Sequence, residues 1–108
     1  MLQNFILTYS VKAQSILDDD KEKAAKVRDE IAELDCWTKS NEVETTFSGR
    51  EYISGMTDSD RKASARKVVV EQFLPILKKY EAKSYDVKIY CAMMCEKIDT
   101  PFEFIIQN

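Results

Sequence analysis

Apolar and polar positions alternate along several stretches of the chain and follow a helical period along two others. Alternation predicts strands over residues 2–11 and 85–95 and a last short strand over 102–106. Apolar residues spaced three or four apart predict helices over residues 13–34 and about 59–80. Further strands are predicted over two short segments, 36–39 and 43–48, and residues 50–57 either extend this hairpin or form a loop.

Local signals refine the two predicted helices. Residues 18–20 are three aspartates that would lie in the first turn of the first helix, where carboxylates offset the positive end of the dipole. The second helix is expected to begin at a capping residue within 57–59. Pro75 lies inside it and predicts a kink in the preceding turn. The apolar side of this helix is expected to include Ala63 and Val70.

The order of predicted elements is β-α-β-β-α-β-β, which predicts one α+β domain over residues 1–108. Each helix links two strands, so right-handed crossovers place both helices on the same face of one sheet. This is the ferredoxin-like β-α-β-β-α-β arrangement, with an antiparallel-containing sheet and one extra C-terminal strand. A chain of 108 residues, 44% of them apolar, is large enough to build one core.

Composition limits the chemistry that the chain can perform. It contains no histidine, which removes the commonest general base and the commonest nitrogen ligand for metals. None of the three cysteines is in a Cys-x-x-Cys pair, and we expect free thiols, no metal site and no cofactor. Cys91, Met93 and Cys95 share the core face of a predicted strand, which favours packing over soft-metal binding. We expect a cytoplasmic protein, since no segment resembles a signal peptide or a membrane span.

The charge of −3 is unevenly distributed. Residues 61–108 carry 9 basic and 6 acidic residues, whereas residues 1–60 carry 7 basic and 13 acidic ones. Two interpretations remain open for the basic cluster that begins the second helix: a solvated outer face, or a site for the phosphates of RNA. Trp37, Tyr52 and Tyr90 are candidates to stack on bases beside it, and the alternative for Trp37, a lone Trp at a helix–strand junction, is a place in the core. The candidate RNA-binding residues of this helix cluster are Arg61, Lys62, Arg66 and Lys67.

Two segments carry a family resemblance. Residues 5–11, Phe-Ile-Leu-Thr-Tyr-Ser-Val, resemble the first strand of the CRISPR-adaptation nuclease superfamily. Residues 34–47 resemble its short second strand, tight break and third strand. Relatives include the VapD ribonucleases and the GhoS-type antitoxin, a family type that cleaves a toxin transcript. The resemblance implies a ferredoxin-like fold, an RNA-acting protein and a homodimer in which the C-terminal strand crosses to the partner.

One position departs from the pattern of this superfamily. Its metal-dependent members place an aspartate at the end of the first strand, where this chain has Ser10, a poor ligand for a hard cation. A metal-free ribonuclease site would have to draw on Tyr9, Ser10 and either Arg28 or Arg50. The alternative function is a non-catalytic module that binds a protein partner, such as an antitoxin, phage inhibitor or regulator.

Overall fold

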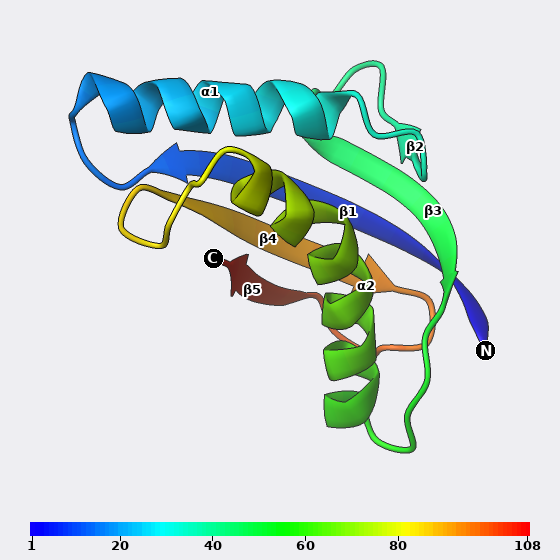
Figure 1. Cartoon of the computed structure of the whole chain (residues 1–108). Coiled ribbons are helices and arrows are strands. Elements are labelled where there is room, and N and C mark those ends of the chain that lie inside the picture. The colour runs from blue at the N-terminus through cyan, green and yellow to red at the C-terminus, as the bar shows by residue number, and fades with distance from the viewer.

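The protein has one five-stranded sheet in which every neighbouring pair of strands is antiparallel (Figure 1). The computed structural model describes residues 1–108, and its strands lie in the order β2-β3-β1-β4-β5. The predicted α+β class is confirmed, and the sheet with its two helices is compatible with a ferredoxin-like fold. In chain order, the elements are β1 (Leu2–Ala13), α1 (Asp18–Ala32), β2 (Thr38–Lys39), β3 (Thr46–Tyr52), α2 (Asp58–Lys79), β4 (Val87–Cys95) and β5 (Phe102–Ile106).

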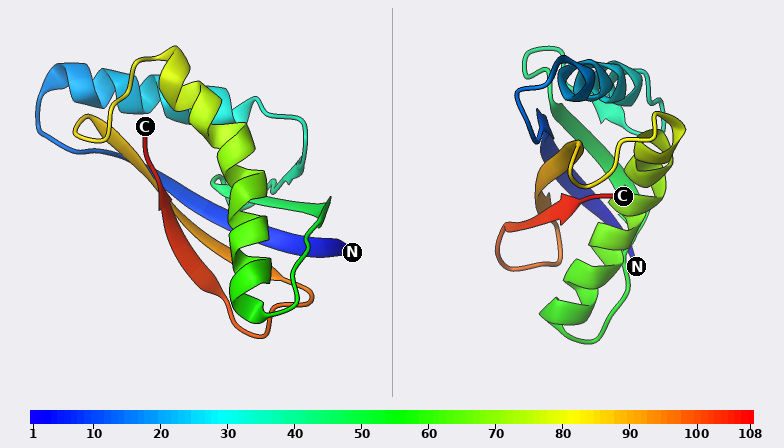
Figure 2. Two further views of the ribbon diagram at one scale, coloured as in Figure 1. Left: turned by 60° about the horizontal axis from the view of Figure 1, so that its bottom comes forward. Right: turned by 60° about the vertical axis from the view of Figure 1, so that its left-hand side comes forward.

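The sheet is buried on one face only. β1 lies at its centre, between β3 and β4, and every second side chain from Phe5 to Val11 is buried. β4 repeats this pattern from Val87 to Cys95. Side chains of a strand point alternately to the two faces, so the intervening residues lie on the opposite face. Figure 2 shows both helices on the buried face, which leaves the other face of the sheet uncovered.

The two helices begin in different ways. The side-chain oxygen of Thr57 caps α2 by accepting a hydrogen bond from the backbone N–H of Asp60 at 3.1 Å. α1 has no side-chain cap, but Ser15 Oγ accepts a bond from the Leu17 N–H and donates one to the Asp20 carboxylate at 2.5 Å. Pro75 lies within α2, and the helix bends toward its C-terminal end, in agreement with the predicted kink (Figure 2).

A polar cluster joins the two helices. Glu30 of α1 accepts hydrogen bonds from Lys79 Nζ at 2.7 Å and from the Tyr80 hydroxyl at 2.5 Å. The hydrogen bond from Lys79 is the main cause that lowers the pKa of Glu30, and the bond from Tyr80 is the second. The bond to Glu30 in turn raises the pKa of Lys79. The carboxylate therefore stays ionised, and the cluster fixes how the C-terminal end of α2 lies against α1.

Aromatic rings fill the part of the core next to β3. The Trp37 ring packs edge-on against Phe5 at 5.3 Å and Phe47 at 5.7 Å between ring centroids. Its indole N–H donates to Glu51 at 3.1 Å, so the polar end of a 6% exposed side chain has a partner. Trp37 is therefore a core residue and is unavailable to stack on a base. Gly49 lies directly beneath it, in the middle of β3.

Several predicted boundaries were wrong, and tertiary contacts explain the differences. β1 continues to Ala13, and α1 begins only at Asp18. The connection is held by the Gln14 N–H, which donates to the backbone carbonyl of Asp86 at 2.8 Å, and Ile16 is exposed. β4 begins at Val87 rather than at residue 85.

The hairpin β2–β3 also differs from the prediction. β2 is reduced to two residues, and β3 runs over 46–52 instead of 43–48, so Val43 is exposed in the turn. Residues 50–52 extend the strand, while the rest of 50–57 is a connection. Trp37 accounts for the shift, because its ring needs the position without a side chain at Gly49 opposite Phe5.

In the N-terminal half of α2, the structure buries a different side of the helix from the one predicted. Ala65 and Val69 are fully buried, whereas Ala63 is exposed and Val70 is only half-buried. Further along the helix, Phe73, Ile76 and Leu77 lie in the core. The N-terminal half of α2 therefore buries a different side from the predicted one, with side chains of the same size.

Replacing Gly49 by alanine is expected to destabilise the fold. A Cβ at this position would lie 2.8 Å from Trp37 Cδ1 and 3.1 Å from Phe5 Cζ, so both rings must shift. We expect the free energy of unfolding to fall by about 1–3 kcal/mol, measured by urea denaturation. Ser48→Ala is the control, because Ser48 is exposed on the side of the same strand that faces away from the helices. Equal unfolding midpoints for the two variants would contradict this account of the Trp37 site.

Candidate nucleic-acid interface

The face of the sheet opposite the helices, called the open face below, carries the outward side chains of its strands. Residues that are directly opposite on antiparallel neighbours form rows across this face. The rows, read from one end of β1, are Lys12 with Lys88, Ser10 with Tyr90 and Ile105, Thr8 with Ala92 and Glu103, Ile6 with Met94 and Ser48, and Asn4 with Arg50.

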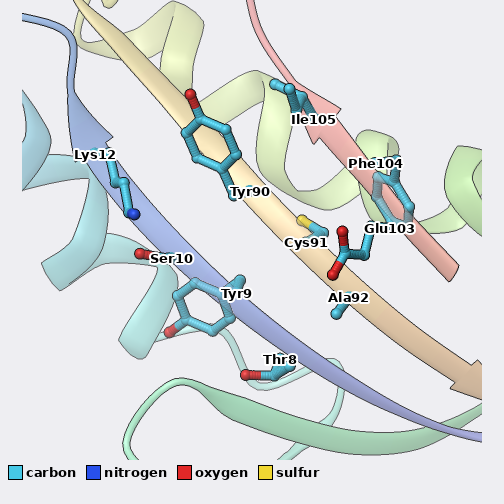
Figure 3. A pocket seen from close by; sticks show the side chains of 10 residues that line it. All are labelled: Thr8, Tyr9, Ser10, Lys12, Tyr90, Cys91, Ala92, Glu103, Phe104 and Ile105. Atoms are coloured by element: carbon cyan, nitrogen blue, oxygen red, sulfur yellow. The ribbon is translucent and has the colours of Figure 1, made fainter. Parts of the chain in front are cut away.

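A groove of about 720 Å³ runs along the open face over β1, β4 and β5 (Figure 3). In Figure 3 the Tyr90 ring lies over β4 with one face toward the viewer, and the Glu103 carboxylate reaches from β5 toward Ala92. Tyr90 is 37% exposed, so part of its side chain is accessible to a ligand. The groove therefore combines an aromatic surface with a cationic and an anionic side chain. Its outward-facing lining includes Thr8, Ser10, Lys12, Tyr90, Glu103 and Ile105.

Two lysines form the row at one end of this groove, and one of them, Lys12, lines it. Lys12 of β1 and Lys88 of β4 are directly opposite in the antiparallel register. Like charges in this relation are destabilising. No carboxylate relieves the repulsion, because the three ion pairs of the chain involve other residues. Lys12 Nζ lies 5.5 Å from the centroid of the Tyr90 ring, and the lysine pair thus borders the aromatic surface.

The other end of the open face is more apolar. Ile6 and Met94 are opposite each other on β1 and β4, and each is 53% exposed. They border a second shallow groove, of about 730 Å³, which also reaches Arg50 and Glu96. The Glu96 carboxylate accepts hydrogen bonds from the backbone and side chain of Asn4 at 3.0 and 3.2 Å. This end is therefore less cationic than the end with the lysine pair.

The helix cluster predicted to bind RNA does not form one basic surface. Arg61 is ion-paired with Asp58 at 2.8 Å, within the first turns of α2. Lys62 and Arg66 lie over the rings of β5, 5.9 Å from the centroid of Phe102 and 6.0 Å from that of Phe104, respectively.

Arg66 makes one further contact with β5. Its guanidinium donates to the backbone oxygen of Ile105 at 3.4 Å, so it also satisfies an acceptor of the edge strand. Lys67 is exposed, with no ion pair. Most of the helix cluster thus has partners within the chain, two of its members on β5.

The four candidate catalytic residues lie in different places. Tyr9 is buried on the helix side of β1, where burial raises its pKa despite the nearby Arg28. Ser10 follows it on the open face, inside the groove. The Arg28 guanidinium donates to the Val11 backbone carbonyl at 2.9 Å from the helix side. Arg50 lies at the far end of the open face, opposite Asn4. The structure therefore does not bring these four side chains together.

Sequence reasoning missed the lysine pair. Lys12 lies one residue beyond the strand predicted over 2–11, and its opposition to Lys88 depends on the register between β1 and β4. Of the three aromatic candidates, Tyr90 lies in the groove, Tyr52 is exposed at the far end of β3, and Trp37 is in the core. The alternation that predicted the strand over 85–95 already placed Lys88 and Tyr90 on one face. This alternation was the feature of the sequence that indicated a site on this face of the sheet.

Comparison with protein-family models, with curated proteins and with solved structures found no match to this chain. The resemblance to CRISPR-adaptation nucleases, VapD and GhoS therefore stays a prediction. No three carboxylate or thiol side chains lie close enough together to hold a metal ion. Neither helix is both long and apolar enough to cross a membrane.

The thiols are predicted to differ sharply in reactivity. All three cysteines are free, but only Cys36 is exposed. Burial raises the pKa of Cys91 to about 12 and that of Cys95 to about 11, so neither forms the reactive thiolate near neutral pH. We expect one thiol per chain to react with a thiol reagent at pH 8, and three after unfolding. Cys36→Ser is expected to abolish the native reaction, and fast labelling of that variant would show that β4 is not packed as described.

Proposed function

We propose that this protein binds single-stranded RNA on the open face of its sheet, with phosphate at the lysine pair and a base on Tyr90. The opposition of Lys12 and Lys88 in the strand register, with neither lysine in an ion pair, carries the proposal. A pair of like charges weakens the sheet unless an anion lies between them, and proteins accept such local costs mainly at functional sites. A phosphate would turn this repulsion into attraction for both amino groups.

Tyr90 supports nucleic acid as the source of that phosphate. Its partly exposed ring lies in the row next to the lysine pair, within a groove that crosses three strands. Bases stack on aromatic side chains of open sheets, while lysines bind the backbone between them. The amino group of Lys12, which now lies over the ring, is at the end of a flexible stem. It can move to a phosphate and release the ring to a base.

The proposal includes a ferredoxin-like fold with β5 as an added strand, which agrees with the strand order and with helices on one face. It is limited to binding, because the candidate catalytic residues lie apart. An RNA-binding antitoxin fits it better than an endoribonuclease does. The predicted homodimer through the C-terminal strand stays a prediction. In this chain β5 pairs with its own β4, and Arg66 contacts the Ile105 carbonyl.

Binding of a protein partner is the second candidate function, and the exposure of Ile6 and Met94 favours it. Two large apolar side chains that are adjacent and half exposed are more typical of a protein contact than of a phosphate path. A lysate pull-down that recovers one stoichiometric protein, lost in Ile6→Ser/Met94→Ser and insensitive to ribonuclease, would support it. Recovery of RNA alone would exclude it.

Removing the lysine pair is predicted to weaken RNA binding without weakening the fold. In Lys12→Ala/Lys88→Ala we expect a roughly 10- to 30-fold higher Kd at 0.1 M salt for a labelled single-stranded RNA, measured by fluorescence anisotropy. The slope of log K against log salt should fall by about 1.4, the value for two phosphate contacts on a single strand. The urea midpoint should stay the same or rise, because a repulsion is removed.

A matched variant separates this site from the helix cluster. Lys62→Ala/Lys67→Ala removes the same charge from α2, away from the groove. We expect it to change the Kd less than threefold at the same salt concentration. A larger increase in Kd for Lys62→Ala/Lys67→Ala than for Lys12→Ala/Lys88→Ala would show that RNA binds at the helix cluster instead. The absence of RNA binding by the wild type at low salt would refute the proposed function.

Tyr90→Leu is predicted to weaken RNA binding by about 1–3 kcal/mol, because leucine keeps apolar volume but offers no ring for stacking. Tyr85→Leu is the control, since Tyr85 is exposed in the connection before β4 and lies outside the groove. The measurement is the same anisotropy titration, with circular dichroism to compare the folds. Equal affinities of the two variants would show that no base stacks on Tyr90.

A further inference from the structure

We propose that the groove prefers guanine among the four RNA bases and that Glu103 is the residue that selects it; this inference rests on the proposed RNA binding. Glu103 lies on β5, opposite Ala92, in the row next to the one that contains Tyr90. Its carboxylate reaches over β4 into the groove (Figure 3). A base stacked on Tyr90 would therefore direct an edge toward this carboxylate.

Glu103 has no partner of its own. It takes part in none of the three ion pairs of the chain, and its carboxylate accepts no side-chain or backbone hydrogen bond. The exposed carboxylate is therefore free to accept bonds from a ligand. A phosphate beside it would be repelled, so the RNA backbone is expected to follow the lysine pair and not this row.

The rows of the open face give the order of the contacts. The lysine pair, the Tyr90 row and the Glu103 row follow one another along β4 at alternate positions, 88, 90 and 92. Alternate positions on a strand are about 7 Å apart. A nucleotide that lies along β4 would thus place its phosphate at one end of this series, its base over Tyr90 and the edge of the base at Glu103.

Guanine is the base whose edge matches a carboxylate. It presents two adjacent donors, N1–H and the N2 amino group, which can bond both carboxylate oxygens at once. Adenine and cytosine present one amino group next to an unprotonated ring nitrogen, whose lone pair opposes the second carboxylate oxygen. Uracil presents a single N–H between two carbonyl oxygens. Bidentate hydrogen bonding to a charged group is the kind of contact that discriminates between bases.

The experiment compares nine-residue RNAs that differ only at the central position. Each has four uridines on either side of guanosine, adenosine, cytidine, uridine or inosine, and binding is measured by fluorescence anisotropy at low salt. We expect the wild type to bind the guanosine RNA about tenfold or more tightly than the adenosine, cytidine and uridine RNAs. Inosine lacks the N2 amino group, so its affinity should fall between those of guanosine and uridine.

Glu103→Gln is expected to abolish the preference, so that the affinities for the guanosine, adenosine, cytidine and uridine RNAs differ by no more than about twofold. Binding of the all-uridine RNA should stay unchanged or tighten, because a negative charge is removed from the groove. Glu22→Gln, which removes the same charge from an exposed position on α1, is expected to keep the guanosine preference.

Two failures are distinguishable in this design. Binding of all five RNAs with equal affinity, or a guanosine preference that survives in Glu103→Gln, would overturn the role of Glu103 and leave the proposed RNA binding intact. Absence of binding to every RNA would overturn both. Thermal unfolding of each variant confirms that the comparison is made between folded proteins.

Discussion

One-sided burial of the sheet is the constraint on which the rest of the structure depends. Both helices pack on the same face, so β1 and β4 must present an apolar side chain at every second position. A slip of one residue in either strand would place its whole apolar set in water. The register between β1 and β4 is thereby determined over nine residue pairs, from Phe5 with Cys95 to Ala13 with Val87.

The same register determines which outward side chains meet. Because core packing sets the pairing of β1 and β4, the backbone positions of Lys12 and Lys88 are fixed opposite each other. A surface lysine pair on a flexible loop would separate, whereas this one is attached to the two most extensively paired strands of the sheet. The rigidity that places Tyr90 and Glu103 in neighbouring rows has the same origin, since β4 also pairs with β5.

The sequence predicted those parts of the fold in which local pattern and tertiary packing agree. Strict alternation located β1 and β4, and helical spacing located both helices, with Thr57 at the start of α2. The displaced β3 could not be predicted, because its position depends on a contact between Trp37 and Gly49 twelve residues away. The start of α1 likewise depends on the distant Asp86 carbonyl.

In the candidate site, too, residues placed by a local pattern could be predicted, and residues placed by distant contacts could not. Tyr90 could be proposed from its place on an alternating strand, but the lysine pair depends on a strand register that no single segment specifies. The helix cluster looked more basic in the sequence, yet Lys62 and Arg66 lie over the phenylalanines of β5 and Arg61 is paired with Asp58. Charge density along a sequence therefore says little about which cations can accept a ligand.

A cation that already has an aromatic ring or a carboxylate must lose that contact when it binds phosphate, and this cost applies to Lys12 over Tyr90 as it does to Lys62 and Arg66. Lys12 and Lys88 gain from a phosphate in two ways, because each attracts it and because it screens one from the other. This second gain is specific to the lysine pair, although the helix cluster contains more positive charges. For that reason the proposed RNA site is on the sheet rather than on the helix.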